Sequence, residues 1–118
     1  MHLRRKKGNQ GELLAKNYLK KNGYKILHAP WYALPLGEID IIARDDEELV
    51  FVEVKARGSN ECGYPEEAVN YTKLKKLKSL VDLYLQEKRI VGSSYRLDVI
   101  AVEFEFDPPK ITHIKCVG

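Results

Sequence analysis

The sequence predicts a mixed α/β fold, in which a central sheet is flanked by helices. Two patterns lead to this prediction. Apolar residues recur at helical spacing in residues 9–22 and 65–89, whereas shorter runs are rich in β-branched residues or alternate between apolar and polar. The expected strands are residues 37–42, 49–55 and 95–102, with a last strand at residues 110–117 after a Pro-Pro break.

Each predicted helix has an apolar stripe that would pack on the sheet. The first helix runs from Asn9 to Asn22, before Gly23, a residue type common just after helix ends. Its stripe consists of Leu14, Ala15, Tyr18 and Leu19. The second begins near Pro65, a favoured first-turn residue, and continues to about Arg89. Its stripe consists of Ala68, Tyr71, Leu74, Leu77, Val81, Tyr84 and Leu85.

Length and composition predict one domain over residues 1–118. A chain of 118 residues with 44% hydrophobic content can fill one core. No apolar run is long enough to span a bilayer, and residues 1–7 lack the apolar stretch of a signal peptide. We therefore expect a cytoplasmic protein.

Charged residues interrupt two of the predicted strands. Glu38 and Asp40 lie in residues 37–42, and Glu53 and Lys55 in residues 49–55. Burying an unpaired charge costs several kcal/mol or more. Because residues two apart share one face of a strand, an antiparallel hairpin would bring these groups together. The expected opposed pairs are Asp40 with Glu53, Glu38 with Lys55, and Ile42 with Phe51.

Two interpretations of this cluster compete. In the first, Glu38 and Lys55 form an ordinary cross-strand ion pair, which stabilises only modestly. That interpretation leaves Asp40 facing Glu53, and like charges across a sheet are destabilising unless a cation lies between them. We therefore favour a metal site, and oxygen ligands without a histidine pair or thiolate cluster favour Mg²⁺ or Mn²⁺ over zinc.

These residues resemble the PD-(D/E)-x-K nuclease signature, with Asp40 as the first acid and Glu53-Val54-Lys55 as the E-x-K. The wider sequence, from about Gly8 to about Val102, resembles the YraN family of small bacterial proteins. The segments that carry the resemblance include Gly8–Ala15, Gly23–Leu27, Gly37–Asp40, Phe51–Arg57, Glu67–Val69 and Arg96–Val99. The resemblance implies a restriction-endonuclease-like αβββαβ core, related to archaeal Holliday-junction resolvases.

The resemblance implies metal-assisted hydrolysis of phosphodiester bonds in DNA, including branched or junction DNA, by a homodimer. Asp40, Glu53 and the carbonyl of Val54 would hold the metal, and Lys55 would orient the attacking water. Glu38 or Glu12 would complete the site. Without the resemblance, Glu12 is an acid in the first turn of a helix, where it complements the helix dipole.

Basic residues suggest where a nucleic acid would bind. The net charge is only +3, but lysines and arginines gather at residues 4–7, 20–21 and 73–78. The expected contacts are Arg57, Lys73, Lys6 and Lys7. The alternative for the lysines of residues 75–78 is a solvated helix face.

One segment departs from the family pattern. Before Gly37, where an Asn and an Arg are expected, this chain has His28–Pro35. Trp31 in this segment and Tyr64 further on would either stack on bases or be partly buried. Two other functions stay open, namely a non-catalytic nucleic-acid-binding module and a structural subunit whose acids recruit a basic partner.

Overall fold

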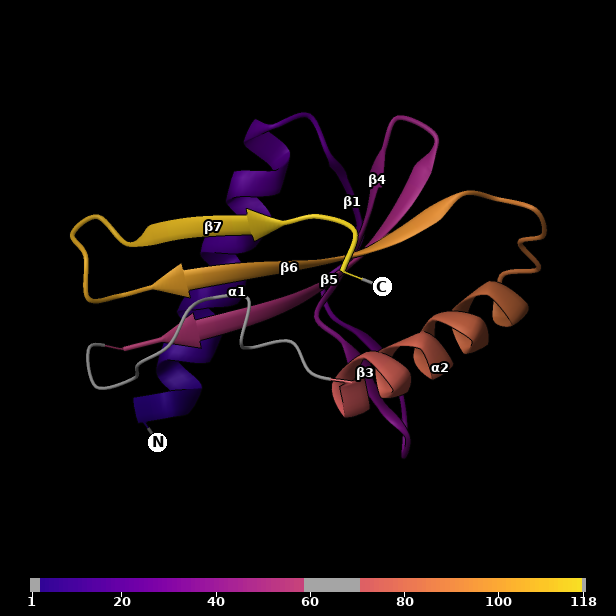
Figure 1. The fold of residues 1–118 in the computed structure, drawn as a ribbon, viewed down its shortest axis with the longest axis horizontal. Coiled ribbons are helices and arrows are strands. Elements are labelled where there is room, and N and C mark those ends of the chain that lie inside the picture. Colours follow the sequence, from indigo (N-terminus) through magenta and orange to yellow (C-terminus); the bar gives the residue numbers. More distant parts are fainter. Residues whose placement is uncertain (1–2, 59–70, 118) are drawn as a thin grey trace.

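The computed structural model describes residues 3–58 and 71–117 as a five-stranded sheet covered by two helices, with a separate two-stranded hairpin (Figure 1). Neither described helix is long and apolar enough to cross a membrane. The elements in chain order are α1 (Leu3–Lys21), β1 (Lys25–His28), β2 (Trp31–Ala33), β3 (Gly37–Ile39), β4 (Ile41–Asp45), β5 (Glu48–Arg57), α2 (Tyr71–Glu87), β6 (Tyr95–Glu103) and β7 (Lys110–Ile114).

The sheet is mixed, as predicted. Its strand order is β1-β4-β5-β6-β7, and only β5 and β6 run parallel. A parallel pair needs a crossover connection, and α2 lies within it (Figure 1). The prediction that residues 95–102 form a strand at or next to the centre is confirmed, because β6 lies beside the central β5.

Each face of the sheet has its own apolar core. On the α1 side, Ala15 and Leu19 are fully buried against strand residues such as Val50, Val52 and Ile100. The predicted stripe of the first helix is therefore confirmed. The helix begins at Leu3 rather than Asn9 because the arginines and lysines before residue 9 are themselves good helix formers.

The α2 side confirms most of the second stripe and corrects one residue. Leu77, Val81 and Tyr84 are buried as predicted, but Tyr71 is 79% exposed. The prediction omitted Leu80, which is 3% exposed. Successive residues of a helix step by about 100°, so including Leu80 moves the centre of the buried stripe to a side of the helix away from Tyr71. Residues 59–70, including the predicted start near Pro65 and the stripe residue Ala68, lie outside the described part of the chain.

A close contact fixes α1 against the sheet. A Cβ atom on Gly11 would lie 2.9 Å from the Cβ of Ala56 in β5, a distance that real side chains do not tolerate. Only glycine allows the helix to approach this strand so closely. The contact holds the first half of α1, including Glu12, beside the sheet.

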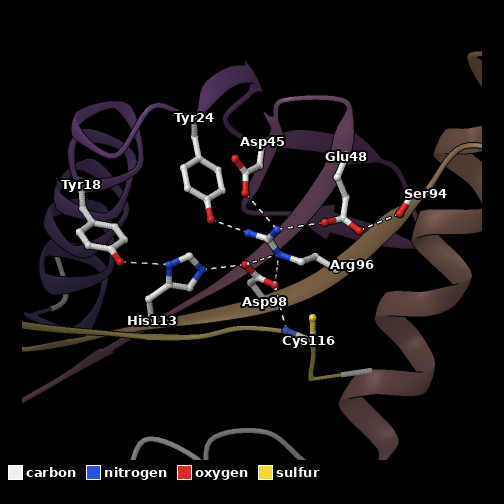
Figure 2. A network of polar contacts seen from close by, with 9 residues as sticks. All are labelled: Tyr18, Tyr24, Asp45, Glu48, Ser94, Arg96, Asp98, His113 and Cys116. Carbon is white, nitrogen blue, oxygen red and sulfur yellow. Dashed lines mark hydrogen bonds and ion pairs between the residues drawn. The ribbon is translucent and has the colours of Figure 1, made fainter.

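A buried charge network joins the strands at the turn between β4 and β5 (Figure 2). Its centre is Asp98, which is completely buried, and the Nε of Arg96 donates to both of its carboxylate oxygens at 3.1 Å. Arg96 also donates to Asp45 at 3.2 Å, to Glu48 at 3.1 Å and to the Tyr24 hydroxyl. One guanidinium therefore ties β6 to both sides of the hairpin turn.

Asp98 has further hydrogen-bond partners besides Arg96. His113 Nε2 lies 2.7 Å from Asp98, and the Cys116 backbone N–H donates to Asp98 at 3.1 Å. Because an ionised carboxylate only accepts, Nε2 carries a proton, and Nδ1 lies within hydrogen-bond distance of the Tyr18 hydroxyl, at 3.1 Å. Burial works to raise the pKa of Asp98, but these hydrogen bonds and Arg96 lower it below the usual range.

Asp98→Ala should lower the free energy of unfolding by about 3–5 kcal/mol, because it removes the completely buried counter-charge of Arg96. Denaturant unfolding followed by circular dichroism measures this loss. The matched control is Asp82→Ala on the exposed face of α2, which should cost less than about 0.5 kcal/mol. Equal losses in the two variants would show that the network adds no stability.

Candidate active site

The candidate site is built where the hairpin joins the sheet, at Asp40. This residue lies between β3 and β4, and the predicted pairing of Ile42 with Phe51 is confirmed. The same register, continued by two residues, puts Asp40 across from Glu53. The Val54 N–H donates to Asp40 Oδ2 at 2.8 Å, so a side-chain carboxylate accepts a bond at the end of the β4–β5 ladder.

Glu38 does not take the predicted position. It lies in β3, where it pairs with Tyr32 of β2 rather than with Lys55, and it is exposed. The prediction assumed one continuous strand over residues 37–42. Instead, residues 37–39 pair with β2 in the separate two-stranded sheet, and the chain enters the five-stranded sheet only after Asp40. Glu38 still affects the site, because its charge raises the pKa of Asp40.

Glu12 reaches the site from the other side. It is half-buried on α1 and lines a small depression of about 140 Å³ together with Asp40. Burial raises the pKa of Glu12, a hydrogen bond with Asp40 lowers it, and the charges of Glu38 and Glu53 raise it, with a net rise. The structure thus places Glu12 beside Asp40, and its role as an auxiliary acid stays a prediction.

Asp40 has the most perturbed acid group of the cluster. Its pKa is raised from 3.8 to about 8, first by burial and then by the charge of Glu53, with further contributions from Glu12 and Glu38. The Val54 N–H acts in the opposite direction. Burial and the neighbouring acids therefore disfavour the ionised form of Asp40. A nearby cation would favour its ionised form.

Lysines lie close to these acids. Lys73 of α2 lies 3.2 Å from Glu53 Oε1, so it contacts one of the acids, and its role as a nucleic-acid contact stays a prediction. Burial tends to lower the pKa of Lys73, but its contact with Glu53 and the charge of Asp40 contribute to a net rise. Lys55 is half-buried in β5, two residues from Glu53.

The other predicted nucleic-acid contacts lie further away. Arg57 is half-buried at the end of β5, and its carbonyl accepts the N–H of Phe104. Lys6 and Lys7 belong to the first turns of α1, but their side chains lie outside the described part of the structure. The structure therefore does not test a role for these two lysines.

An open groove of about 540 Å³ leads to the acids. One wall is the β2–β3 hairpin and the other is α2, which lie next to each other in Figure 1. Asp40 and Glu53 line this groove, and Asp40 also lines the smaller depression beside α1. Asp40 is thus accessible from two sides.

The donor set fits a hard divalent cation in one specific way. Among the described side chains, no three His, Cys, Asp or Glu residues are grouped so as to hold a metal by themselves. The expected site uses two carboxylates, Asp40 and Glu53, with a backbone carbonyl. In a strand, the N–H and C=O of one residue point to the same side, so the Val54 carbonyl faces the side of Asp40. All these donors are oxygens, which suits Mg²⁺ or Mn²⁺.

Comparison with known proteins gives the family. A model described as "Uncharacterised protein family UPF0102" matches residues 11–102. The chain belongs to this family. YraN is a name of the same family, so the resemblance seen in the sequence is confirmed at this level.

Named relatives of this UPF0102 chain come from several bacteria. A UPF0102 protein of Caldicellulosiruptor saccharolyticus is 44% identical over 99 residues, covering 84% of this chain and 83% of the relative. One of Acetivibrio thermocellus is 44% identical over 102 residues, covering 86% and 78%. One of Clostridium acetobutylicum is 45% identical over 103 residues, covering 86% and 84%. These names state no activity.

Sequence reasoning missed part of the groove of this UPF0102 protein. Tyr32, Leu34 and Lys76 line it beside the acids. The signal was present, because the turn residues Pro35 and Gly37 separate two short runs and favour a hairpin there. Gly37 has a φ of +147°, a conformation that other residues rarely adopt.

The pKa of Asp40 predicts that stability falls as pH rises from about 4 to about 8. In this window the folded chain keeps a proton that the unfolded chain releases. Asp40→Asn cannot ionise but can still accept from Val54. Its melting temperature should exceed that of the wild type by several degrees at about pH 8.5 and by less at about pH 5. Asp82→Asn is the control, and a pH-independent gain in Asp40→Asn would contradict the raised pKa.

Proposed function

We propose that this UPF0102 protein is a Mg²⁺- or Mn²⁺-dependent nuclease with a restriction-endonuclease-like fold, which hydrolyses phosphodiester bonds in DNA. The observation that carries the proposal is the half-buried Asp40 carboxyl, opposed to Glu53 and bonded to the Val54 amide. Opposed acids cost free energy without a cation, and perturbed acids are concentrated at functional sites.

Each residue has a role in this proposal. Asp40, Glu53 and the Val54 carbonyl would hold the ion, and Glu12 would serve as an auxiliary acid beside them. The bound ion would neutralise charge on the phosphate and lower the pKa of the attacking water. Lys55 orients that water, whose oxygen forms the new P–O bond as the bond to the leaving nucleotide oxygen breaks.

Two basic residues act on the substrate. Lys73 forms an ion pair with Glu53 in the metal-free protein, and it turns to a phosphate oxygen when a cation replaces it at Glu53. Arg57, at the end of β5, contacts a more distant phosphate. A homodimer would supply two such sites for two cuts in branched DNA, as the family resemblance implies.

The alternative is a non-catalytic DNA-binding module or structural subunit. The acid cluster argues against simple DNA binding, because ionised carboxylates in the groove repel phosphate. It also argues against a surface that recruits a basic partner, because Asp40 is half-buried and its surroundings raise its pKa, which disfavours the charge that such a partner would bind. Neither alternative predicts metal-dependent cleavage.

Mn²⁺ should bind saturably to the wild type in isothermal titration calorimetry, and this binding should be lost in the Asp40→Ala/Glu53→Ala double variant. Metal must displace the Asp40 proton, so the apparent affinity should rise by up to about tenfold per pH unit between about pH 6 and 8. The double variant Glu47→Ala/Asp82→Ala removes two exposed acids and should bind like the wild type. Absence of binding by the wild type would favour the non-catalytic alternative.

Asp40→Ala and Lys55→Ala should each slow Mn²⁺-dependent cleavage of labelled single-stranded and branched DNA by at least about 100-fold. Each variant removes a group that acts on the ion or on the attacking water. Glu47→Ala and Lys78→Ala change exposed residues outside the groove and should cut like the wild type. Full activity in either site variant, with folding verified by circular dichroism, would refute the mechanism.

A further inference from the structure

The exposed face of the β2–β3 hairpin presents an aromatic side chain to the groove. Tyr32 is 60% exposed and lies directly across from Glu38 on the neighbouring strand. Opposed residues of an antiparallel pair have Cβ atoms about 5 Å apart. Tyr32 lines the same groove as Asp40 and Glu53, so an aromatic ring stands within the groove that holds the acids.

Strand alternation separates Tyr32 from its neighbour Trp31. Trp31 points to the opposite face, is 9% exposed, and packs edge-on against Tyr84 with ring centroids 5.2 Å apart. Of the two interpretations of Trp31, the buried one is therefore confirmed. Trp31 anchors the hairpin to the core, and this anchoring leaves Tyr32 exposed without a role in the fold.

The opposite wall of the groove is positively charged. Lys73 and Lys76 of α2 line it. A Cβ on Gly37 would lie 3.3 Å from Cε of Lys76, so the lysine stem reaches the hairpin itself. In contrast, the hairpin segment 29–39 contains no lysine or arginine. One wall therefore carries lysines that suit phosphates, and the other is aromatic and apolar apart from Glu38.

We propose that this groove binds an unpaired nucleotide, whose base stacks on Tyr32 while the adjacent phosphate lies between the acids and the α2 lysines. This inference deepens the proposed nuclease function and rests on it. A regular duplex presents phosphates outside and keeps its base faces stacked inside, so it offers nothing to the Tyr32 ring. An aromatic platform beside a basic wall is the arrangement that recognises single strands. The substrate is thus DNA with a single-stranded segment at the cut.

The test measures binding without cleavage. Fluorescence anisotropy with Mn²⁺ and low salt compares a labelled single strand with a blunt duplex of the same sequence. The parent chain carries Lys55→Ala, which leaves the proposed metal ligands in place and slows cleavage. Adding Tyr32→Ala should weaken single-strand binding by about tenfold and duplex binding by less than about twofold, whereas Tyr32→Phe should bind like the parent.

A matched control is Phe106→Ala, which removes an aromatic that is 46% exposed and lies in the turn between β6 and β7, outside the groove. It should not change either affinity. The inference is overturned if the parent fails to bind the single strand, or if Tyr32→Ala weakens both DNA forms equally. It is also overturned if the loss accompanies a change from dimer to monomer in sedimentation, which would assign the hairpin to self-association.

The outcomes separate the two proposals. If Asp40→Ala abolishes cleavage but Tyr32→Ala binds single strands normally, the nuclease function stands and the stacking site falls. If Tyr32→Ala loses single-strand binding but the wild type never cleaves with Mn²⁺, the groove is a binding site of a protein without nuclease activity.

Discussion

The hydrogen bond from the Val54 amide to the Asp40 carboxylate joins the parts of the molecule that form the site. The chain leaves its hairpin and enters the sheet at Asp40, and a side chain completes the ladder where the backbone has turned away. Because this bond draws the carboxylate inward, acids from the helix, the hairpin and β5 all influence one group. The groove on one side and the depression on the other are consequences of the same break.

Asp98 and Asp40 show how differently one residue type is used. Asp98 has a guanidinium, an imidazole and an amide as partners, so its charge is stabilised and it joins β6 to β7 and to Cys116 beyond it. Asp40 is surrounded mainly by other acids, so its charge is disfavoured. No described buried side-chain polar atom lacks a hydrogen-bond partner, which makes the cluster at Asp40 the one conspicuous electrostatic cost among the described residues. Such local costs are typical of sites kept for function.

Much of the sheet followed from sequence, because a one-residue slip of the β4–β5 hairpin would have put Ile42 and Phe51 on opposite faces of the sheet. The same reasoning gave the wrong position for Glu38. Ile39 and Ile41 continue a strand-like pattern, although the chain passes from one sheet to the other between them. The position of Tyr32 in the groove wall depends on how the β2–β3 hairpin lies against α2. Hydrophobic periodicity and secondary-structure propensity do not predict such a tertiary contact. Arg96 and Asp98 share a face of one strand, but their partners at Asp45 and His113 are distant in sequence.

The contact between Gly11 and Ala56 limits which substitutions this chain tolerates. The two positions share a space that holds one methyl group and no second one. A larger residue at position 56 is therefore compatible with the fold only if α1 moves outward, and such a movement would withdraw Glu12 from Asp40. Substitutions at these two small residues are thus restricted by the geometry of the acids, although neither residue carries any chemistry of its own.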